Sequence, residues 1–236
     1  MLLDPFHERE SDRVRVSRPQ ASRFAKRVAG DFNPIHDTDA RRFCVPGDLL
    51  FGLVLSHYGL AQTMQFRFDS MLAADTELVL PPDETNTLKL RDQSGQSYLT
   101  VERHGPTIRD QSVIEAFVRE YVAFSGYNFP HYLQPLMEAE GVMFNPQRPF
   151  VIYDTMAFEL SHAELARPAV SLSDSSLSVN GRRGDAMLEF AIHDGDERIG
   201  SGSKRLIISG LQPYDRDRMD QVINAFHERR AAHLGG

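Results

Sequence analysis

The segment from Val28 to Phe43, VAGDFNPIHDTDARRF, brings several polar side chains close together. Asp31, Asn33, Pro34 and His36 all fall between positions 31 and 36. A carboxylate and an imidazole are side chains that proteins use for general acid–base catalysis. The same residue types are common in polar turns, where Asp and Asn oxygens accept hydrogen bonds from the backbone. The segment is therefore either a catalytic site or a turn, and its surroundings must decide.

Nearby residues suggest two other kinds of site, a metal centre and a reactive thiol. His36, Asp37 and Asp39 could ligate a metal, but the segment lacks the Gly and distal Glu of a calcium loop and the paired His of a zinc helix. Cys44 lacks a His and Asn arrangement that marks a thiol nucleophile, so we interpret it as a small buried side chain. We expect no metal and no cofactor.

A weaker copy of the motif stands in the second half of the chain. The sequence NFPHY contains Asn128 and His131 but has no Asp in the partner position. We interpret this copy as chance and His131 as a residue at the start of a helix.

The elements on either side would hold the motif in place. Ser17 and Gln20 have the spacing of a capping box, and the helix that they begin is expected to stop at Gly30. Pro34 disfavours helical backbone at Asn33, so the motif itself should be irregular. The stretch 46–64, PGDLLFGLVLSHYGLAQTM, is apolar nearly all round and predicts a buried helix.

The remaining chain alternates between strand and helix patterns. Strands are predicted near 14–16 and from about 77 to 126, including SVIEAFVREYVAFSG, and again from 176 to 210. Helices are predicted near 129–141 and at the carboxyl end. Because REYVAFSG and KRLIISG end alike, we expect one structural unit used twice, with boundaries at 1–126 and 127–236.

Composition excludes several classes of protein. The net charge of -7, without basic runs between aromatic residues, argues against a nucleic-acid partner. The longest apolar stretch is interrupted by Ser56 and His57 and is shorter than the ~20 residues that cross a bilayer, so no membrane span is expected. The amino end has no signal-peptide pattern, and one Cys forms no disulfide framework. We therefore expect a cytoplasmic protein.

The sequence GDFNPIH, preceded by FAKRVA, resembles the signature of the MaoC-like, (R)-specific enoyl-CoA hydratases of the hotdog superfamily. The fixed positions of that signature correspond to Gly30, Asp31, Asn33, Pro34 and His36. The resemblance covers about residues 24–60. It implies an α+β fold in which a curved antiparallel sheet wraps around a central helix. With the predicted repeat, we expect a double hotdog, a single-chain pseudo-dimer of two such units.

The resemblance also implies roles for individual residues. Asp31 and His36 would hold one water and act as base and acid. Asn33 and Pro34 would orient them, and the backbone N–H of Gly47 would polarise the thioester carbonyl. Asp48 and Cys44 are possible pocket residues, and the Asp48 carboxylate would oppose an enolate if it turned inward.

The expected function is reversible hydration of an acyl thioester, trans-2-enoyl to 3-hydroxyacyl, carried by CoA or an acyl carrier protein. A non-catalytic acyl-thioester-binding protein and a thioesterase are the alternatives. We expect the pocket between the two units, and a chain that is a monomeric pseudo-dimer or a homodimer.

Overall fold

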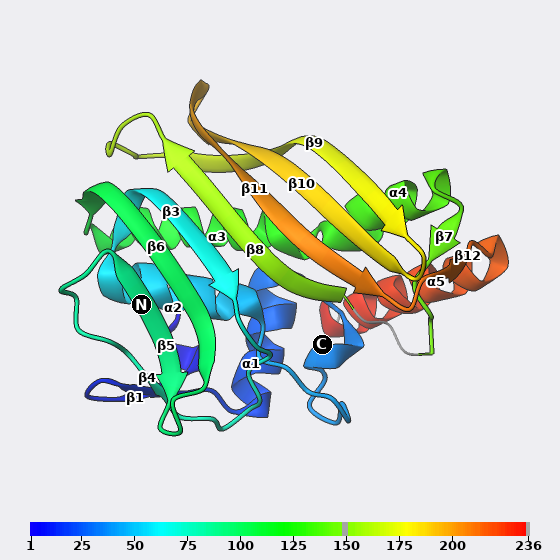
Figure 1. Cartoon of the computed structure of the whole chain (residues 1–236), viewed down its shortest axis with the longest axis horizontal. Helices are drawn as coiled ribbons and strands as arrows, with labels where there is room; N and C mark the ends of the chain where they lie inside the picture. Colours follow the sequence, from blue (N-terminus) through cyan, green and yellow to red (C-terminus); the bar gives the residue numbers. More distant parts are fainter. Residues whose placement is uncertain (148–150, 235–236) are drawn as a thin grey trace.

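The computed structural model describes residues 1–147 and 151–234, and its main feature is a sheet with strand order β1-β2-β4-β5-β6-β3-β8-β11-β10-β9. Every neighbouring pair in this sheet is antiparallel, as predicted. The helices gather behind the sheet in the view of Figure 1. The strands are β1 (Glu8–Glu10), β2 (Arg13–Arg15), β3 (Leu60–Phe68), β4 (Leu78–Val79), β5 (Thr87–Asp92), β6 (Ser97–Ile108), β8 (Val151–Leu160), β9 (Pro168–Asn180), β10 (Arg183–Asp194) and β11 (Glu197–Ser209). A separate ladder joins β7 (Val142–Met143) to β12 (Gln212–Pro213).

Strands β3 and β8 join the two halves of the sheet. Thr63 pairs with Glu159 and Arg67 with Thr155, so strands far apart in sequence lie side by side at the centre. On one side of this join lie strands from the first half of the chain, and on the other side β8 to β11. The sheet is therefore continuous across the point where the two halves meet.

Helix α2 (Gly47–Tyr58) is the buried helix that the apolar stretch predicted. Most of its side chains are buried, in agreement with a sequence that is apolar on every face. It ends six residues before the predicted end at Met64, because Gly59 has a φ of +89° that no α-helix accommodates. From Leu60 onward the chain is β3, so the prediction of helix there was wrong.

The largest error in the predicted elements concerns α3 (Gln111–Gly126), which was expected to be a strand. Its β-branched and aromatic residues satisfy a strand pattern, but its buried positions fall at helical spacing: Ile114, Phe117, Val118, Tyr121 and Val122. Asp110 caps the amino end by accepting a hydrogen bond from the N–H of Ser112. The matching strand endings that suggested a repeat therefore do not exist.

Helix α3 covers the second half of the sheet together with the predicted helix near 129–141. It packs against β9 and against α2. The predicted helix is present as α4 (Leu133–Ala139), which packs with α5 (Arg216–Leu234) around a second, smaller apolar cluster. None of the described helices is both long and apolar enough to span a membrane.

The helix before the motif follows the sequence closely. Helix α1 (Arg18–Phe24) begins with the predicted capping box between Ser17 and Gln20, and continues as the π-helix η2 (Ala25–Ala29). Gly30 ends it with a φ of +64°. The remaining short helices are η1 (Asp4–Phe6), η3 (Pro34–His36) and η4 (Asn128–Tyr132).

Candidate functional site

Backbone hydrogen bonds fix the loop that carries Asp31. The Asp31 N–H donates to the Ala25 carbonyl at 2.8 Å, which completes the end of η2. The Asp31 Oδ1 accepts from the N–H of Asn33 at 2.8 Å, and the Asn33 Oδ1 accepts from the N–H of Ile35 at 3.1 Å. The Asn33 side chain therefore caps η3, while its backbone N–H holds one oxygen of Asp31 and leaves the other free.

The free oxygen of Asp31 faces His36. His36 Nε2 lies 3.5 Å from Asp31 Oδ2, and the imidazole is nearly buried whereas the carboxylate is about one-third exposed. On the other side of the ring, Nδ1 lies 2.7 Å from the Cys44 carbonyl oxygen. Because a carbonyl oxygen only accepts, Nδ1 carries a proton. His36 can therefore gain or lose a proton only at Nε2, the atom that faces Asp31.

One cavity of about 840 Å³ collects the residues of the motif and of α2. Asp31, Asn33, Pro34, His36, Cys44, Gly47 and Asp48 all line it. The end of β3 and the residues that follow it, 68–72, also line the cavity, and so do residues of α3, β8, β11 and α5 from farther along the chain. The predicted meeting of Asp31, His36 and Gly47 in a cavity lined by both halves of the chain is thus present.

Gly47 begins α2 at the cavity, and its lack of a side chain is required there. A Cβ at this position would lie 2.9 Å from Phe68 Cε1 and 3.0 Å from Tyr153 Cδ1. The first N–H groups of an α-helix have no partner inside the helix, and they carry the positive end of its dipole. The site therefore offers N–H donors beside the aromatic rings of Phe68 and Tyr153.

A buried polar network lies next to Gly47. The Ser125 hydroxyl donates to Asp48 Oδ2 at 2.6 Å, and the Lys204 ammonium donates to Ser125 Oγ. Lys204 Nζ also lies 3.9 Å from the centre of the Tyr153 ring. Burial disfavours the charged form of both groups, so it raises the pKa of Asp48 and lowers the pKa of Lys204. Lys204 and Ser125 act in the other direction on Asp48 and lower its pKa. The carboxylate did turn inward, and a lysine from β11 accompanies it.

Ser125, Tyr153 and Lys204 were not singled out from the sequence. One signal was available for Lys204, because Lys204, Leu206 and Ile208 alternate along β11 and all three are buried. A lysine in phase with two core residues indicates a buried charge that needs a partner. Ser125 and Tyr153 carry no comparable local signal.

Helix α5 closes another side of the cavity. Arg218, Val222, Phe226 and Arg229 line it at helical spacing. Phe226 makes an edge-to-face contact with Phe32, with ring centres 5.8 Å apart. The terminal helix is thus part of the cavity wall.

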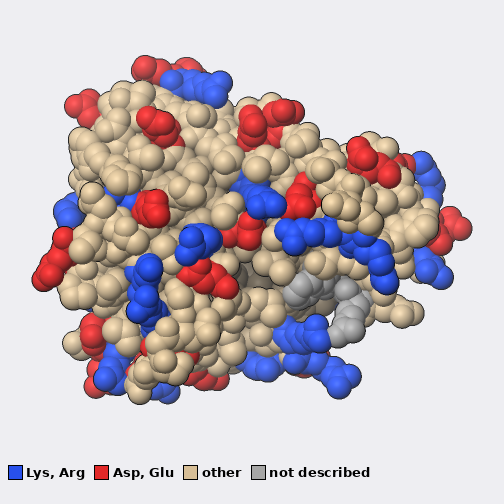
Figure 2. Space-filling model, in the orientation of Figure 1, with Lys and Arg blue, Asp and Glu red and all other residues tan. Residues whose placement is uncertain are grey.

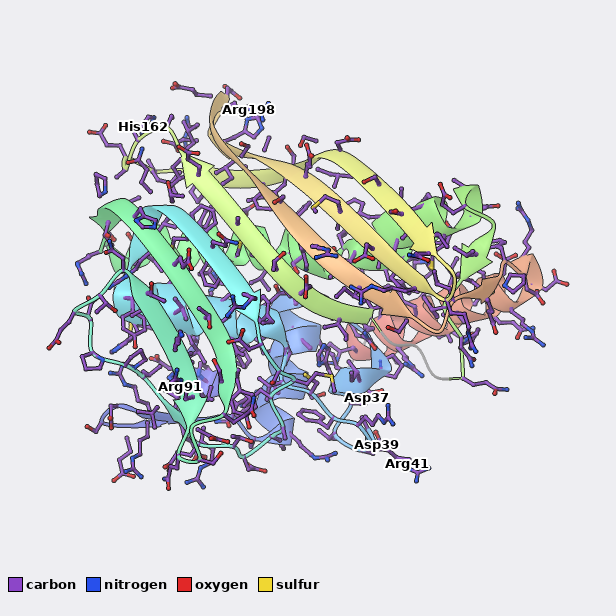
Figure 3. All side chains as sticks on the ribbon, in the orientation of Figure 1. Asp37, Asp39, Arg41, Arg91, His162 and Arg198 are labelled. Carbon is purple, nitrogen blue, oxygen red and sulfur yellow. The ribbon has the colours of Figure 1, made fainter. Side chains whose placement is uncertain are left out.

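The other residues considered from the sequence lie as follows. Cys44 Sγ donates to the Val45 carbonyl, and burial raises the pKa of the thiol to about 11. Asp37 pairs with Lys26 at 2.7 Å, and Figure 3 shows Asp37 and Asp39 on the loop after η3, at the lower edge of the view. His131 stacks on Tyr127, with ring centres 4.0 Å apart.

Three solved structures are similar to this chain at low sequence identity. A conserved protein of unknown function with a hot dog fold, from Alicyclobacillus acidocaldarius, has a TM-score of 0.50 at 10% identity, covering 91% of this chain and 99% of its own. The acyl-CoA thioesterase II from Mycobacterium marinum has a TM-score of 0.46 at 12% identity, covering 91% and 100%. A MaoC-like dehydratase has a TM-score of 0.43 at 12% identity, covering 85% and 97%.

The first of these similarities establishes an α+β hotdog fold. A hotdog fold by itself does not select one activity. No curated protein matches the sequence. Residues 1–217 match DUF3581, described as a protein of unknown function, and the chain belongs to that family.

Proposed function

We propose that this protein is an (R)-specific hydratase or dehydratase of acyl thioesters, related to the MaoC-like branch of the hotdog superfamily. The observation that carries the proposal is the pair Asp31 Oδ2 and His36 Nε2, 3.5 Å apart at the wall of a cavity. A water at hydrogen-bond distance, about 2.8 Å, can contact both atoms from the cavity side because their separation is less than twice that distance. Asp31 and His36 would bind the reacting water in this way.

In the hydration direction, Asp31 begins as a carboxylate and His36 as an imidazolium. Asp31 takes a proton from the water while the water oxygen forms a bond to C3 of the enoyl group. The C2–C3 π electrons move toward the thioester oxygen, and His36 gives its Nε2 proton to C2. Transfer of the proton from Asp31 to His36 then restores both groups. Dehydration is the reverse sequence.

The negative charge that develops on the thioester oxygen needs a stabilising group. The N–H groups at the start of α2, beginning with Gly47, would supply it. Phe68 and Tyr153 flank this position and would keep the thioester carbonyl against the helix end.

We further propose that the chain is a double hotdog whose two units form a single-chain pseudo-dimer. One central helix is available to each half of the sheet, α2 for the first and α3 for the second. Because α3 packs on β9, the boundary between units is better placed before Gln111 than at residue 126. Such a chain can act as a monomer, or assemble further as a homodimer.

The ligand would be an acyl thioester of CoA or of an acyl carrier protein. A cavity of about 840 Å³ lies within the range of roughly 300–1,000 Å³ that is common for small-molecule sites. Its lining includes the apolar side chains of Leu50, Phe129, Leu133, Phe144 and Val222, which suit an acyl chain.

The test is loss of the enoyl-thioester absorbance with trans-2-enoyl-CoA and enoyl carrier-protein substrates over a series of chain lengths. Thiol release is measured in the same samples. Hydration without thiol release supports the proposal, and thiol release would instead identify a thioesterase. Saturable binding without either reaction would identify an acyl-thioester-binding protein.

A further inference from the structure

The position of Asp48 raises an electrostatic problem for the proposed function, on which this inference rests. Asp48 follows Gly47 in the first turn of α2, beside the N–H groups that would face the thioester oxygen. A carboxylate suits the positive end of a helix, but its negative charge opposes negative charge on an adjacent ligand oxygen. An isolated Asp48 anion would therefore weaken the group that is expected to polarise the substrate.

The chain places a positive charge against this carboxylate. Ser125 donates to Asp48 Oδ2 and accepts from Lys204 Nζ, so one hydroxyl links the two charged groups. Residues 48, 125 and 204 are 8%, 2% and 1% exposed, which leaves little water to screen their charges. The partners come from three elements that are distant in sequence, α2, α3 and β11.

Lys204 also lies close to the start of α2. Its Nζ is 3.9 Å from the centre of the Tyr153 ring, and the same ring lies against Gly47. The Tyr153 ring therefore contacts both the lysine ammonium and the start of the helix. The positive charge is placed where it acts on both Asp48 and the oxygen that Gly47 would bind.

Two helix ends favour this arrangement of charges. Asp48 lies in the first turn of α2, and Ser125, which binds the ammonium, lies in the last turn of α3. A negative charge is stabilised at a helix amino end and a positive charge at a carboxyl end. Each member of the pair therefore occupies the helix end that stabilises its own sign.

We infer that Lys204 is a positioning residue that cancels the charge of Asp48 and so keeps the start of α2 able to polarise the thioester carbonyl. The pair has no net charge whether the proton is on Lys204 or on Asp48. Lys204 acts through the electric field at Gly47, because its exposure of 1% leaves almost no surface for direct contact with a substrate. The inference assigns a function in the site to a residue of the second half of the chain.

The experiment measures carbonyl polarisation directly, so that it does not depend on turnover. The probe is butyryl-CoA labelled with ¹³C at the thioester carbon, and the readout is the carbonyl band in isotope-edited infrared spectra of the saturated complex. In the parent protein we expect the band at lower frequency than in water. In Lys204→Met at pH 8, we expect the band to return toward its position in water.

Removing the negative charge instead of the positive one should shift the carbonyl band in the opposite direction. Asp48→Asn removes the negative charge and leaves Lys204, so the band should move to a frequency as low as in the parent or lower. The double variant Lys204→Met with Asp48→Asn has no net charge at this position, and its band should return to the parent value. A pair with only a structural role would not shift the band in opposite directions.

The pH dependence of Lys204→Met is a second readout, which also serves if the variant is too unstable at pH 8. The titratable groups that face Asp48 are then Asp31 and His36 from the loop, Tyr121 from α3 and Tyr153 from β8. Burial raises the pKa of Asp48, and loss of Lys204 raises it further because Lys204 acts to lower it. The band should recover as the pH falls and Asp48 becomes neutral, whereas the double variant should not show this recovery.

Arg205→Met is the matched control, because Arg205 is the next residue of the same strand. It pairs with Asp154 and Asp185 and is 40% exposed in its side chain. Figure 2 shows charged side chains of both signs spread over the face of the molecule in this view. Loss of these two ion pairs should leave the carbonyl band unchanged.

The outcomes separate this inference from the proposed function. An unchanged band in Lys204→Met across the pH range, or a shift in the same direction in Asp48→Asn, overturns the inference alone. Band shifts as expected in a protein that does not hydrate enoyl thioesters support the inference and overturn the hydratase. Failure of any acyl thioester to bind overturns both. In an active enzyme, Lys204→Met should lower kcat roughly 10- to 100-fold, with a smaller change in KM.

Discussion

The two longest internal helices meet the cavity with opposite ends. Helix α2 begins there, at Gly47, and α3 ends there, at Ser125 and Gly126. A helix amino end presents N–H donors and a carboxyl end presents C=O acceptors. The first half of the chain can therefore stabilise an anionic oxygen at the start of α2. The second half stabilises Lys204, which is linked to Asp48 through Ser125.

The two halves also differ in the side chains that they place at the cavity, because the groups proposed to react come from the first half. Asp31 and His36 lie in the segment between η2 and α2, whereas the described residues of the second half place no Asp–His pair at the cavity wall. To the cavity wall the second half contributes Tyr153, Lys204 and one face of α5. Under the proposed function the two halves supply different groups to the site, so substitutions in each half should have different effects.

The largest expected effect is on turnover, in the first half. Asp31→Asn keeps the shape and the acceptor for the Asn33 N–H but removes the base, so turnover should fall by about 10²–10⁴ with little change in ligand affinity. His36→Ala should cost a similar factor. Because both residues hold one water, the double variant should lose far less than the product of the two. Rates, dissociation constants and melting temperatures are measured on the same preparations; a fall in melting temperature with unchanged turnover would show that the motif is only a turn.

The contact of α3 with the loop should have the largest effect on stability. A Cβ at Gly126 would lie 1.6 Å from the Ala29 carbonyl oxygen, so Gly126→Ala must move the end of α3 away from η2. We expect a loss of more than about 3 kcal/mol in the free energy of unfolding, measured with urea. Gly210→Ala is the control: its φ of +74° disfavours a side chain, but nothing lies within 4 Å of its Cβ position, and it should cost about 1 kcal/mol. Equal losses of stability in the two variants would mean that the contact between the end of α3 and Ala29 does not stabilise the segment that carries the motif.

A smaller effect is expected at the copy of the motif in the second half. His131 stacks on Tyr127 and is absent from the cavity lining. His131→Ala should therefore destabilise the protein by about 0.5–1.5 kcal/mol and leave turnover within about twofold of the parent. A loss of turnover as large as that of His36→Ala would show that the second half also supplies a reacting group. This result would contradict the difference between the two halves.

The smallest effect is expected at Cys44. Its carbonyl oxygen accepts the proton of His36 Nδ1, and Cys44→Ala retains this oxygen, so turnover should change by less than about twofold. Because burial raises the pKa of the thiol to about 11, less than one molecule in a hundred carries the thiolate at pH 8. Iodoacetamide should accordingly label the native protein far more slowly than the protein unfolded in urea. Rapid labelling of the native form would contradict this.

The elements near the motif could be predicted from sequence because their determinants are local. Ser17, Gln20 and Gly30 define the helix ends, and Pro34 fixes the irregular backbone after Asn33. The prediction of a strand at 112–126 was also wrong for a local reason. Its apolar residues are β-branched or aromatic, and their helical spacing was given less weight than their residue types.

The buried pair of Asp48 and Lys204 could not be predicted in the same way. Ser125 is 77 positions from Asp48 and 79 from Lys204, so only the packing of α3 between α2 and β11 brings them together. The inward position of Asp48 was considered from the sequence, but the cation that accompanies it depends on strand order. That order is a property of the whole sheet.

The open edge of the wide sheet at β9 has its own consequence for solubility. Strand β9 ends the order of strands, so it presents backbone groups that another chain could pair with. Its middle is rich in hydroxyl and acidic side chains, with the sequence SLSDSSLS from 171 to 178, and most of these positions are exposed or partly exposed. The irregularity opposite Glu189 and Phe190 also interrupts a regular ladder at this edge. Both features disfavour edge-to-edge aggregation, which allows one chain to keep a sheet this wide without a covering strand.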